Sequence, residues 1–390
     1  MYSFISPIKI HHGEGSVSKL EGILEELRAD KVFLLTDPIL KELGVIEPVL
    51  KILEGRGVTV TLSTNVIPEP PLEVGNKVIE EVRKTKPDLV LGIGGGSALD
   101  LAKAAAVLAD NDGNVQDYLN LSGTKKIKKK GIPKVLLPTT AGTGAEVTDI
   151  AVFSLADTKD VITHDYLLAD YAIVDPVFTY TLPAKVTAAS GIDALTHAIE
   201  AFTSVNATPL TDLLALDAMR RINKYVRTAV WNGKDKEARG EMALGSLLAG
   251  LSFYNAGVAG VHALAYPLGG LFKIPHGESN AVLLPYVYDA IWPSCLEKMV
   301  LVAEAFELPA EGKSAREIAL DVVQSLYDLV EDVGLPKSIG EYDIHPEDIN
   351  LLAENGVKQK RLLARSPKPL HLKDVKQIYQ HAYEGKLTSK

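Results

Sequence analysis

The feature that most limits the fold is an alternation of short β-rich runs with helical patterns over roughly the first 180 residues. The runs are rich in Val, Leu and Ile, and occupy residues 31–37, 58–64, 88–94, 133–140 and 171–175. Between them, a 3.6-residue periodicity occupies residues 47–54, 74–84 and 98–109. This alternation predicts a parallel sheet with helices on its faces. The opening piece resembles a strand and turn that lead into a helix, and we expect its His11 and His12 to be structural.

After about residue 181 the strand signals nearly vanish and long amphipathic patterns follow. These patterns cover residues 184–203, 209–229, 235–255, 296–307, 313–333, 345–354 and 372–384. A chain of 390 residues exceeds the roughly 250–300 residues at which a single core stops growing. We therefore predict two domains, an α/β domain at 1–180 and a helical domain at 181–390.

Charge and cysteine content exclude several classes of protein. The net charge of −9 (41 basic against 50 acidic residues) argues against a nucleic-acid partner. Cys295 is the only cysteine, which suits a reducing compartment. The N-terminus lacks the features of a signal peptide, and no apolar run approaches the ~20 residues of a membrane span. We expect a soluble cytoplasmic protein with no membrane partner.

The stretch GIDALTHAIEAF suggests a metal site. In a helix, Asp193 and His197 stand at i and i+4 on one face, and Ser190 is a candidate N-cap. His262 and His276 follow, 14 residues apart with Gly/Pro turns between them. One carboxylate with three imidazoles suits Fe(II) or Zn(II) better than Ca or Mg. Taken singly, each residue is as readily explained as a hydrogen-bonded structural or core residue.

A glycine loop joins the strand-like run at 88–94 directly to a helix. Gly94, Gly95, Gly96 and Ser97 would let phosphate oxygens approach backbone N–H groups at the helix N-terminus. The spacing is neither the Rossmann fingerprint nor a Walker loop, so a tight turn explains it about equally well. Asp100 and Lys103, one turn further on, are expected to face either a ligand or solvent.

A second loop of small residues follows the next strand-like run and contains Thr139, Thr140 and Thr143. Ligands of open α/β sheets collect at the carboxyl ends of the strands, where these hydroxyl groups are expected. Asp37 closes the first predicted strand. It could accept hydrogen bonds from a ribose diol or cap the turn that contains Pro38.

Six stretches, in this order, resemble the iron-containing (group III) alcohol dehydrogenases: GGGSALDLAKA, PTTAGTGAEVT, AIVDP, GIDALTHAIEAF, HALAYPLGG and IPHGESNAVLLP. The resemblance extends over essentially the whole chain. It implies a Rossmann-like dinucleotide-binding domain, an all-α metal-binding domain, and an active-site cleft between them. Dehydroquinate synthase shares this two-domain plan.

Residue by residue, the resemblance implies metal ligation by Asp193, His197, His262 and His276, with Fe(II) as the first choice and Zn(II) as the second. It places the pyrophosphate on Gly94, Gly95, Gly96 and Ser97, and the nicotinamide side on Thr139, Thr140 and Thr143. It places Asp100 and Lys159 near the cofactor, and Asp37 where an acidic residue favours NAD(H) over NADP(H).

Two positions depart from the family pattern. Many members carry a second His four residues after the first downstream ligand, where this chain has Tyr266. A phenol has an ordinary pKa near 10 and an imidazole near 6.5, so the usual proton shuttle cannot be transferred. Tyr266 then joins Asp100 as a candidate catalytic residue, with a ribose hydroxyl or water as other proton routes. Glu69 stands where the family commonly has Asn.

The resemblance implies an enzyme that transfers hydride between a primary alcohol or aldehyde and NAD(H), with the metal polarising the substrate oxygen. A small-molecule substrate and a homodimer or larger homo-oligomer are expected. One alternative is a hydroxyacid–oxoacid transhydrogenase with tightly held NAD, whose branch resembles the Tyr-containing pattern. Others are a metal- and NAD-dependent lyase of the dehydroquinate synthase type and a non-catalytic nucleotide-binding protein.

Overall fold

The computed structural model describes residues 2–155 and 158–388. They divide into two compact units. The first, which we call the α/β unit, comprises Ser6–Thr181. The second, the helical unit, begins at Leu182 and includes the N-terminal residues up to Ile5.

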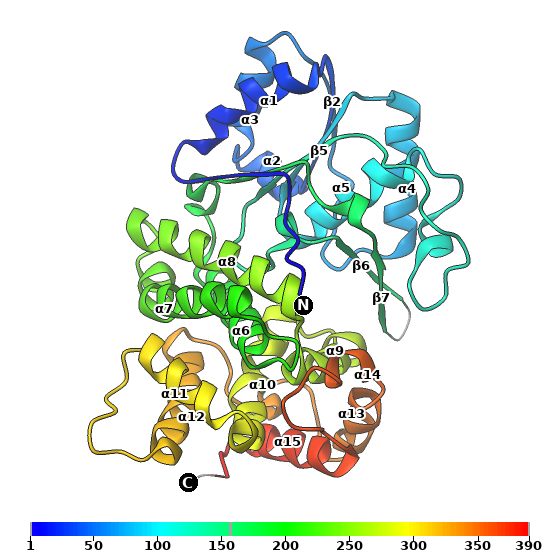
Figure 1. The fold of residues 1–390 in the computed structure, drawn as a ribbon. Coiled ribbons are helices and arrows are strands. Elements are labelled where there is room, and N and C mark those ends of the chain that lie inside the picture. The colour runs from blue at the N-terminus through cyan, green and yellow to red at the C-terminus, as the bar shows by residue number, and fades with distance from the viewer. Residues whose placement is uncertain (1, 156–157, 389–390) are drawn as a thin grey trace. The chain divides into compact units, whose positions relative to one another are not determined.

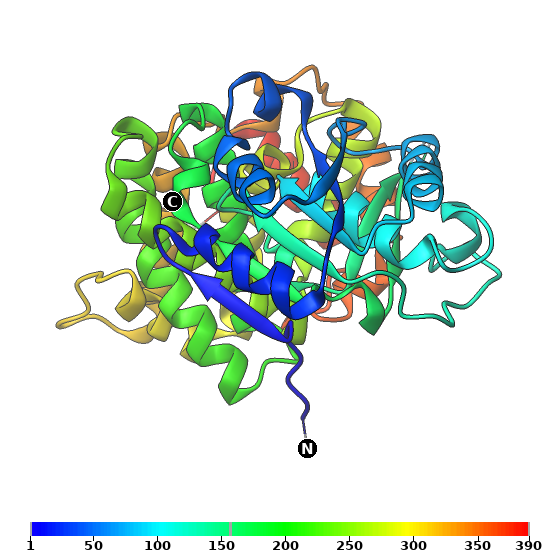
Figure 2. The ribbon, with the colours of Figure 1, turned by 90° about the horizontal axis from the view of Figure 1, so that it is seen from above.

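Strands of the α/β unit pair in parallel, as predicted, in the order β1-β8-β5-β4-β2-β3. Their bounds are Lys9–His12 (β1), Lys31–Thr36 (β2), Thr59–Ser63 (β3), Leu89–Gly94 (β4), Lys134–Pro138 (β5) and Tyr171–Val174 (β8). The edge strand β1 is the blue arrow in Figure 2. Because β2 and β5 flank β4, the loops that leave these three strands emerge together at one edge of the sheet.

Helices cover both faces of this sheet (Figure 1). Their bounds are Leu20–Leu27 (α1), Pro38–Glu42 (α2), Glu47–Gly55 (α3), Leu72–Thr85 (α4) and Gly96–Leu108 (α5). Successive residues of a strand point to opposite faces. Val32 and Leu34 accordingly pack with α1 and α3, while Phe33 and Leu35 pack with α4 and α5. Burial on both faces explains why these strands are apolar throughout instead of alternating.

An antiparallel hairpin that the sequence analysis did not predict lies beside the sheet. It consists of β6 (Ile150–Ser154) and β7 (Lys159–Thr163). Each strand has only five residues, and the pair directly follows the threonine-containing loop, so the local pattern was too short to separate strand from loop.

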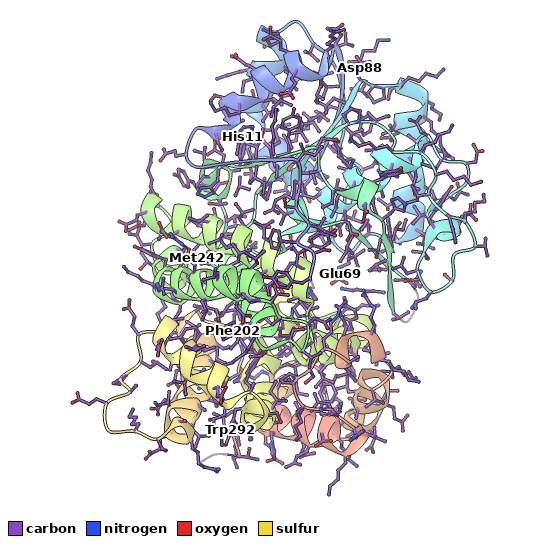
Figure 3. The ribbon with its side chains drawn as sticks, in the orientation of Figure 1. His11, Glu69, Asp88, Phe202, Met242 and Trp292 are labelled. Atoms are coloured by element: carbon purple, nitrogen blue, oxygen red, sulfur yellow. The ribbon has the colours of Figure 1, made fainter. Side chains whose placement is uncertain are left out.

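The helical unit contains α6 (Ala184–Thr203), α7 (Pro209–Trp231), α8 (Lys236–Ala256), α9 (Gly260–Phe272), α10 (His276–Ile291), α11 (Leu296–Ala305), α12 (Ala315–Asp332), α13 (Asp348–Gly356), α14 (Lys360–Leu363) and α15 (Leu372–Glu384). Helices α6, α7 and α8 pack closely. A Cβ on Gly191 would lie 2.8 Å from Val226 Cγ2 and 2.9 Å from Met242 Cε, so a larger residue would require these side chains to shift. Met242 and Phe202 are labelled on these helices in Figure 3.

The predicted N-cap role of Ser190 is wrong. Helix α6 begins at Ala184 after Pro183, and Ser190 lies inside the helix, where its Oγ donates to the carbonyl oxygen of Val186. The helical pattern that starts at residue 184 continues through Gly191, because close packing against α7 and α8 offsets the low helix propensity of glycine.

Helices α9 and α10 fill a region in which the sequence analysis saw mainly Gly/Pro turns. Pro267 and Pro285 lie inside them, and tertiary packing stabilises both helices despite the missing donors. In the part of the chain that the structure describes, no single helix is long and apolar enough to cross a membrane. Helices α8 and α9 satisfy that test only as a pair, bent by 102°.

Candidate metal centre and nucleotide-binding edge

Three of the four predicted metal ligands come together in the helical unit. Asp193 on α6, His262 on α9 and His276 on α10 each offer one ligand atom, and these atoms lie within 4.8 Å of one another. Asp193 Oδ1 is 3.8 Å from His262 Nε2 and 3.7 Å from His276 Nε2. Ligands of a tetrahedral cation at about 2.1 Å lie about 3.4 Å apart, so a small contraction would suit Fe(II) or Zn(II). The donor set and the spacing therefore fit the expected metal.

His197 lies beside this group but is not one of its three members. Its Nε2 is 3.9 Å from Asp193 Oδ1, one helical turn away. Its ring stacks on Phe253, with centroids 4.3 Å apart, and on His262, at 4.7 Å. His197 Nε2 is thus about as far from Asp193 Oδ1 as the Nε2 atoms of His262 and His276 are.

The three side chains differ in how far they are buried. The side chains of Asp193 and His262 are each 3% exposed, whereas that of His276 is 31% exposed. Burial raises the pKa of Asp193, but the imidazoles of His197, His276 and His262 and a hydrogen bond from Asn280 outweigh it, so the pKa lies below its ordinary value. An ionised carboxylate in a dry site attracts a cation, and a small molecule can approach on the side of His276.

Glu200 is a candidate site residue that was not predicted from the sequence. Its Oε2 lies 2.6 Å from His262 Nδ1, and its Oε1 accepts from the N–H of Val261 at 2.6 Å. A carboxylate on one ring nitrogen fixes the tautomer and turns the other nitrogen toward a metal. The signal was present in the sequence, because Glu200 falls on the same helical face as Asp193 and His197.

Gly277 allows α10 to deliver its ligand. A Cβ at this position would lie 2.5 Å from the carbonyl oxygen of Ala189 on α6. Any larger residue would push the start of α10, and His276 with it, away from Asp193.

Tyr266 is one turn beyond His262 on α9, and its ring centroid is 6.2 Å from that of His276. It packs with Phe253 and Leu363 against a small apolar core of Val258, Ala263 and Leu362. Burial raises the pKa of the Tyr266 phenol above its ordinary value. The phenol therefore stays protonated near neutral pH and can donate a hydrogen bond.

In the α/β unit, the predicted glycine loop lies where β4 meets α5. Gly94 has φ +156°, and a Cβ there would meet the Cβ of Ala98 at 2.6 Å. Helix α5 begins at Gly96 with Gly95 as its N-cap. The first N–H groups of a helix have no partner within it and attract anions. Gly95, Gly96 and Ser97 are half-buried, and the loop can thus bind a phosphate group through its backbone.

The threonine loop lies against the glycine loop. The N–H of Thr139 donates to the carbonyl oxygen of Gly94 at 3.0 Å. A Cβ on Gly96 would come within 2.9 Å of Thr143 Cγ2, and one on Gly95 within 3.7 Å of Thr140 Cγ2. Thr140 and Thr143 are half-buried and can offer their hydroxyl groups to the same ligand.

Asp37 stands at the end of β2, beside β4. Its Oδ1 accepts from the N–H of Ile39 at 2.8 Å and caps α2. The capping role is therefore the one observed, and the second carboxylate oxygen remains available for a ribose.

Asp100 and Lys103 do not face solvent. Lys103 is fully buried, pairs with Asp100 Oδ1 at 2.8 Å, and donates to the carbonyl oxygens of Ala145 and Ile150. Asp100 Oδ2 accepts from the N–H of Val152 on β6. Burial raises the pKa of Asp100, against the lowering effect of Lys103. The pair fixes the threonine loop and the hairpin to α5.

Lys159 and Glu69 form a second link to the glycine loop. Lys159 Nζ lies 2.7 Å from Glu69 Oε1, and the N–H of Glu69 donates to Ser97 Oγ at 3.1 Å. Glu69 is labelled in Figure 3. The hairpin residue Lys159 is thereby held beside the predicted pyrophosphate position.

Two family models match the chain. Residues 7–176 match the iron-containing alcohol dehydrogenase model, and residues 187–383 match the C-terminal model of the Fe-containing alcohol dehydrogenase family. Together they span both units.

Comparison with individual proteins points to the same family. The chain is 53% identical to long-chain-alcohol dehydrogenase 1 of Geobacillus thermodenitrificans, over 98% of this chain and 96% of the relative. It is 34% identical to the NAD-dependent methanol dehydrogenase of Bacillus methanolicus, over 97% and 99%. The crystal structure of a 1,3-propanediol oxidoreductase matches with a TM-score of 0.94 and 32% identity, over 98% of this chain and 100% of that one.

Proposed function

Because the chain belongs to the iron-containing alcohol dehydrogenase family, we propose that it transfers hydride between a primary alcohol or its aldehyde and a nicotinamide cofactor, with NAD(H) preferred over NADP(H). The observation that carries this proposal is the convergence of Asp193, His262 and His276 from three different helices. An ion pair that served only stability would need Asp193 and one histidine, so the second histidine favours a metal site.

Asp193, His197, His262 and His276 are proposed to hold Fe(II), with Zn(II) as the alternative. A divalent cation bound there would supply a Lewis acid that polarises the substrate oxygen. The chain buries Asp193 and His262 away from water, and Glu200 fixes the tautomer of His262. The partly exposed His276 leaves room for the substrate to approach.

Asp37, the segment Gly94–Ser97, Thr139, Thr140, Thr143 and Lys159 are proposed to bind the dinucleotide. The N–H groups at the start of α5, which have no partner within the helix, suit its pyrophosphate. The carboxylate of Asp37 would accept hydrogen bonds from an unmodified ribose and repel a 2′-phosphate, which supports NAD(H).

Tyr266 is proposed to donate a hydrogen bond to the substrate oxygen. Its raised pKa argues against a role as a general base near neutral pH. The resemblance implied that Asp100 is a catalytic residue. Because Asp100 contacts Lys103 and the backbone of β6, we propose that it affects catalysis indirectly, by holding these groups in place.

An apolar substrate is proposed, because Phe253, Val258 and Leu362 form a hydrophobic group that includes Tyr266. The relative that is 53% identical carries the name long-chain-alcohol dehydrogenase. Homo-oligomerisation is also proposed: β1 lies at the sheet edge, next to Ile8, which is 69% exposed. An edge of this kind invites pairing with a second copy.

The test is the rate of NADH and NADPH oxidation by purified protein with aldehydes of two to sixteen carbons, before and after chelation and re-addition of Fe(II) or Zn(II). Metal-restored activity that prefers NADH and longer chains supports the proposal. Turnover of a hydroxyacid–oxoacid pair without added cofactor would instead identify a transhydrogenase, an alternative that Tyr266 favours. Light scattering of the same sample gives the oligomeric state.

A further inference from the structure

Asn280 is a fully buried residue on α10, one turn beyond His276. Its Nδ2 donates to Asp193 Oδ1 at 2.7 Å, and lies 3.1 Å from His262 Nε2 and 3.3 Å from His276 Nε2. One amide nitrogen therefore contacts the ligand atoms that three separate helices bring together.

The other end of this amide shows that the arrangement does not serve packing. Among the described residues, Asn280 Oδ1 has no hydrogen-bond partner, although it is buried. Buried polar atoms are nearly always paired, and leaving one unpaired costs free energy. A leucine would fill a similar volume without that cost, so the contacts of the nitrogen explain an asparagine here better than packing does.

We propose that Asn280 is a positioning residue of the metal centre, acting through Asp193; this inference rests on the proposed metal-binding function. A carboxylate oxygen has two lone pairs. Donation from Asn280 to one of them turns the other toward the cation. The amide has one further N–H group, which can donate to only one of the two histidines, and His262 is the nearer. A bound cation would take the place of this second contact.

This role predicts a loss of metal affinity when the amide is removed. Substitution of groups that orient metal ligands typically lowers affinity about 10- to 100-fold. The effect concerns the equilibrium with the cation, so it is measurable without substrate or nicotinamide.

The experiment compares the full-length wild type with Asn280→Leu and a matched control, Ser279→Ala. Ser279 is the preceding residue of the same helix, equally buried, and its Oγ donates to the backbone of Ile274. Each protein is stripped of metal and titrated with Zn(II) against a chromogenic chelator. Co(II) titration then reports the ligand geometry through its visible absorption.

Asn280→Leu is expected to bind Zn(II) 10- to 100-fold more weakly and to change the Co(II) spectrum, with Ser279→Ala unchanged. If Asn280→Leu does not fold, Asn280→Ser gives the same test with a polar group that is too short to span the three ligands. Wild-type affinity and an unaltered spectrum in a folded variant would overturn the inference, as would tighter binding. A wild type that binds no cation would instead overturn the proposed function.

Discussion

Glu200 Oε2 and His262 Nδ1 lie 2.6 Å apart, with both side chains almost completely buried. This contact, made across 62 residues of sequence, orients the imidazole that faces Asp193. It also couples α6 to the start of α9, because the other oxygen of Glu200 accepts from the N–H of Val261.

Glu200→Gln is expected to lower metal affinity about 10- to 100-fold, because an amide no longer fixes one tautomer of His262. The measurement is chelator competition at constant pH. Thr196→Val serves as the control, since Thr196 is buried on the same helix and its Oγ1 donates to the carbonyl oxygen of Ile192. Equal affinities for Glu200→Gln and the wild type would remove Glu200 from the metal centre.

His276→Ala is expected to abolish metal retention and turnover together, because it removes one of the three ligand atoms that converge among the described residues. Elemental analysis of the purified protein and an NADH assay give the two results. His345→Ala, which alters an exposed histidine, should leave both unchanged. Normal activity in a metal-free His276→Ala protein would contradict the scheme.

Asp37→Asn is expected to shift the cofactor preference toward NADPH by removing the negative charge that would face a 2′-phosphate. Asparagine caps helices about as well as aspartate, so stability should stay close to that of the wild type. The ratio of kcat/KM for NADH and NADPH gives the preference, and thermal unfolding checks the cap. If the ratio of the two kcat/KM values is the same in Asp37→Asn and the wild type, Asp37 serves only as a helix cap.

Lys103→Met is expected to destabilise the α/β unit by about 3–5 kcal/mol, because it leaves the buried carboxylate of Asp100 without its partner. It should also weaken NADH binding, since Lys103 holds the carbonyl oxygens of Ala145 and Ile150 next to the threonine loop. Denaturant unfolding and calorimetric titration with NADH measure the two effects. Lys126→Met, at an exposed position, is the control.

Glu146 predicts a pH dependence of stability. Burial raises its pKa from 4.5 to about 7, so the folded state favours the protonated form. Its contribution to stability is complete below pH 4.5 and is lost as the pH rises through 7. The difference is about 3 kcal/mol. Glu146→Gln should therefore become more stable relative to the wild type between pH 4.5 and 8. A difference in the free energy of unfolding between the two proteins that stays constant over this pH range would contradict the prediction.

Much of the fold was predictable because it rests on local patterns. Runs such as residues 31–37 and 88–94 are apolar on both faces, which only a strand between two helical layers requires. Residues 184–203 were predicted as a helical pattern and form α6 with the same bounds. The β6–β7 hairpin and the full extent of α9 and α10 were not predicted, since their stability comes from tertiary packing that overrides short or Pro-containing segments.

The sequence by itself determined which residues could bind a metal or a phosphate, because ligand chemistry belongs to the side chain and i, i+4 spacing belongs to the helix. It also determined the family through motifs in a fixed order. Only the tertiary structure decided which candidates meet: Asp193, His262 and His276 converge, His197 lies beside them, and Asp100 turns to Lys103. The contacts of Glu200 and Asn280 with these ligands also emerged only there, because their partners lie far away in sequence and the distances depend on how α6, α9 and α10 pack.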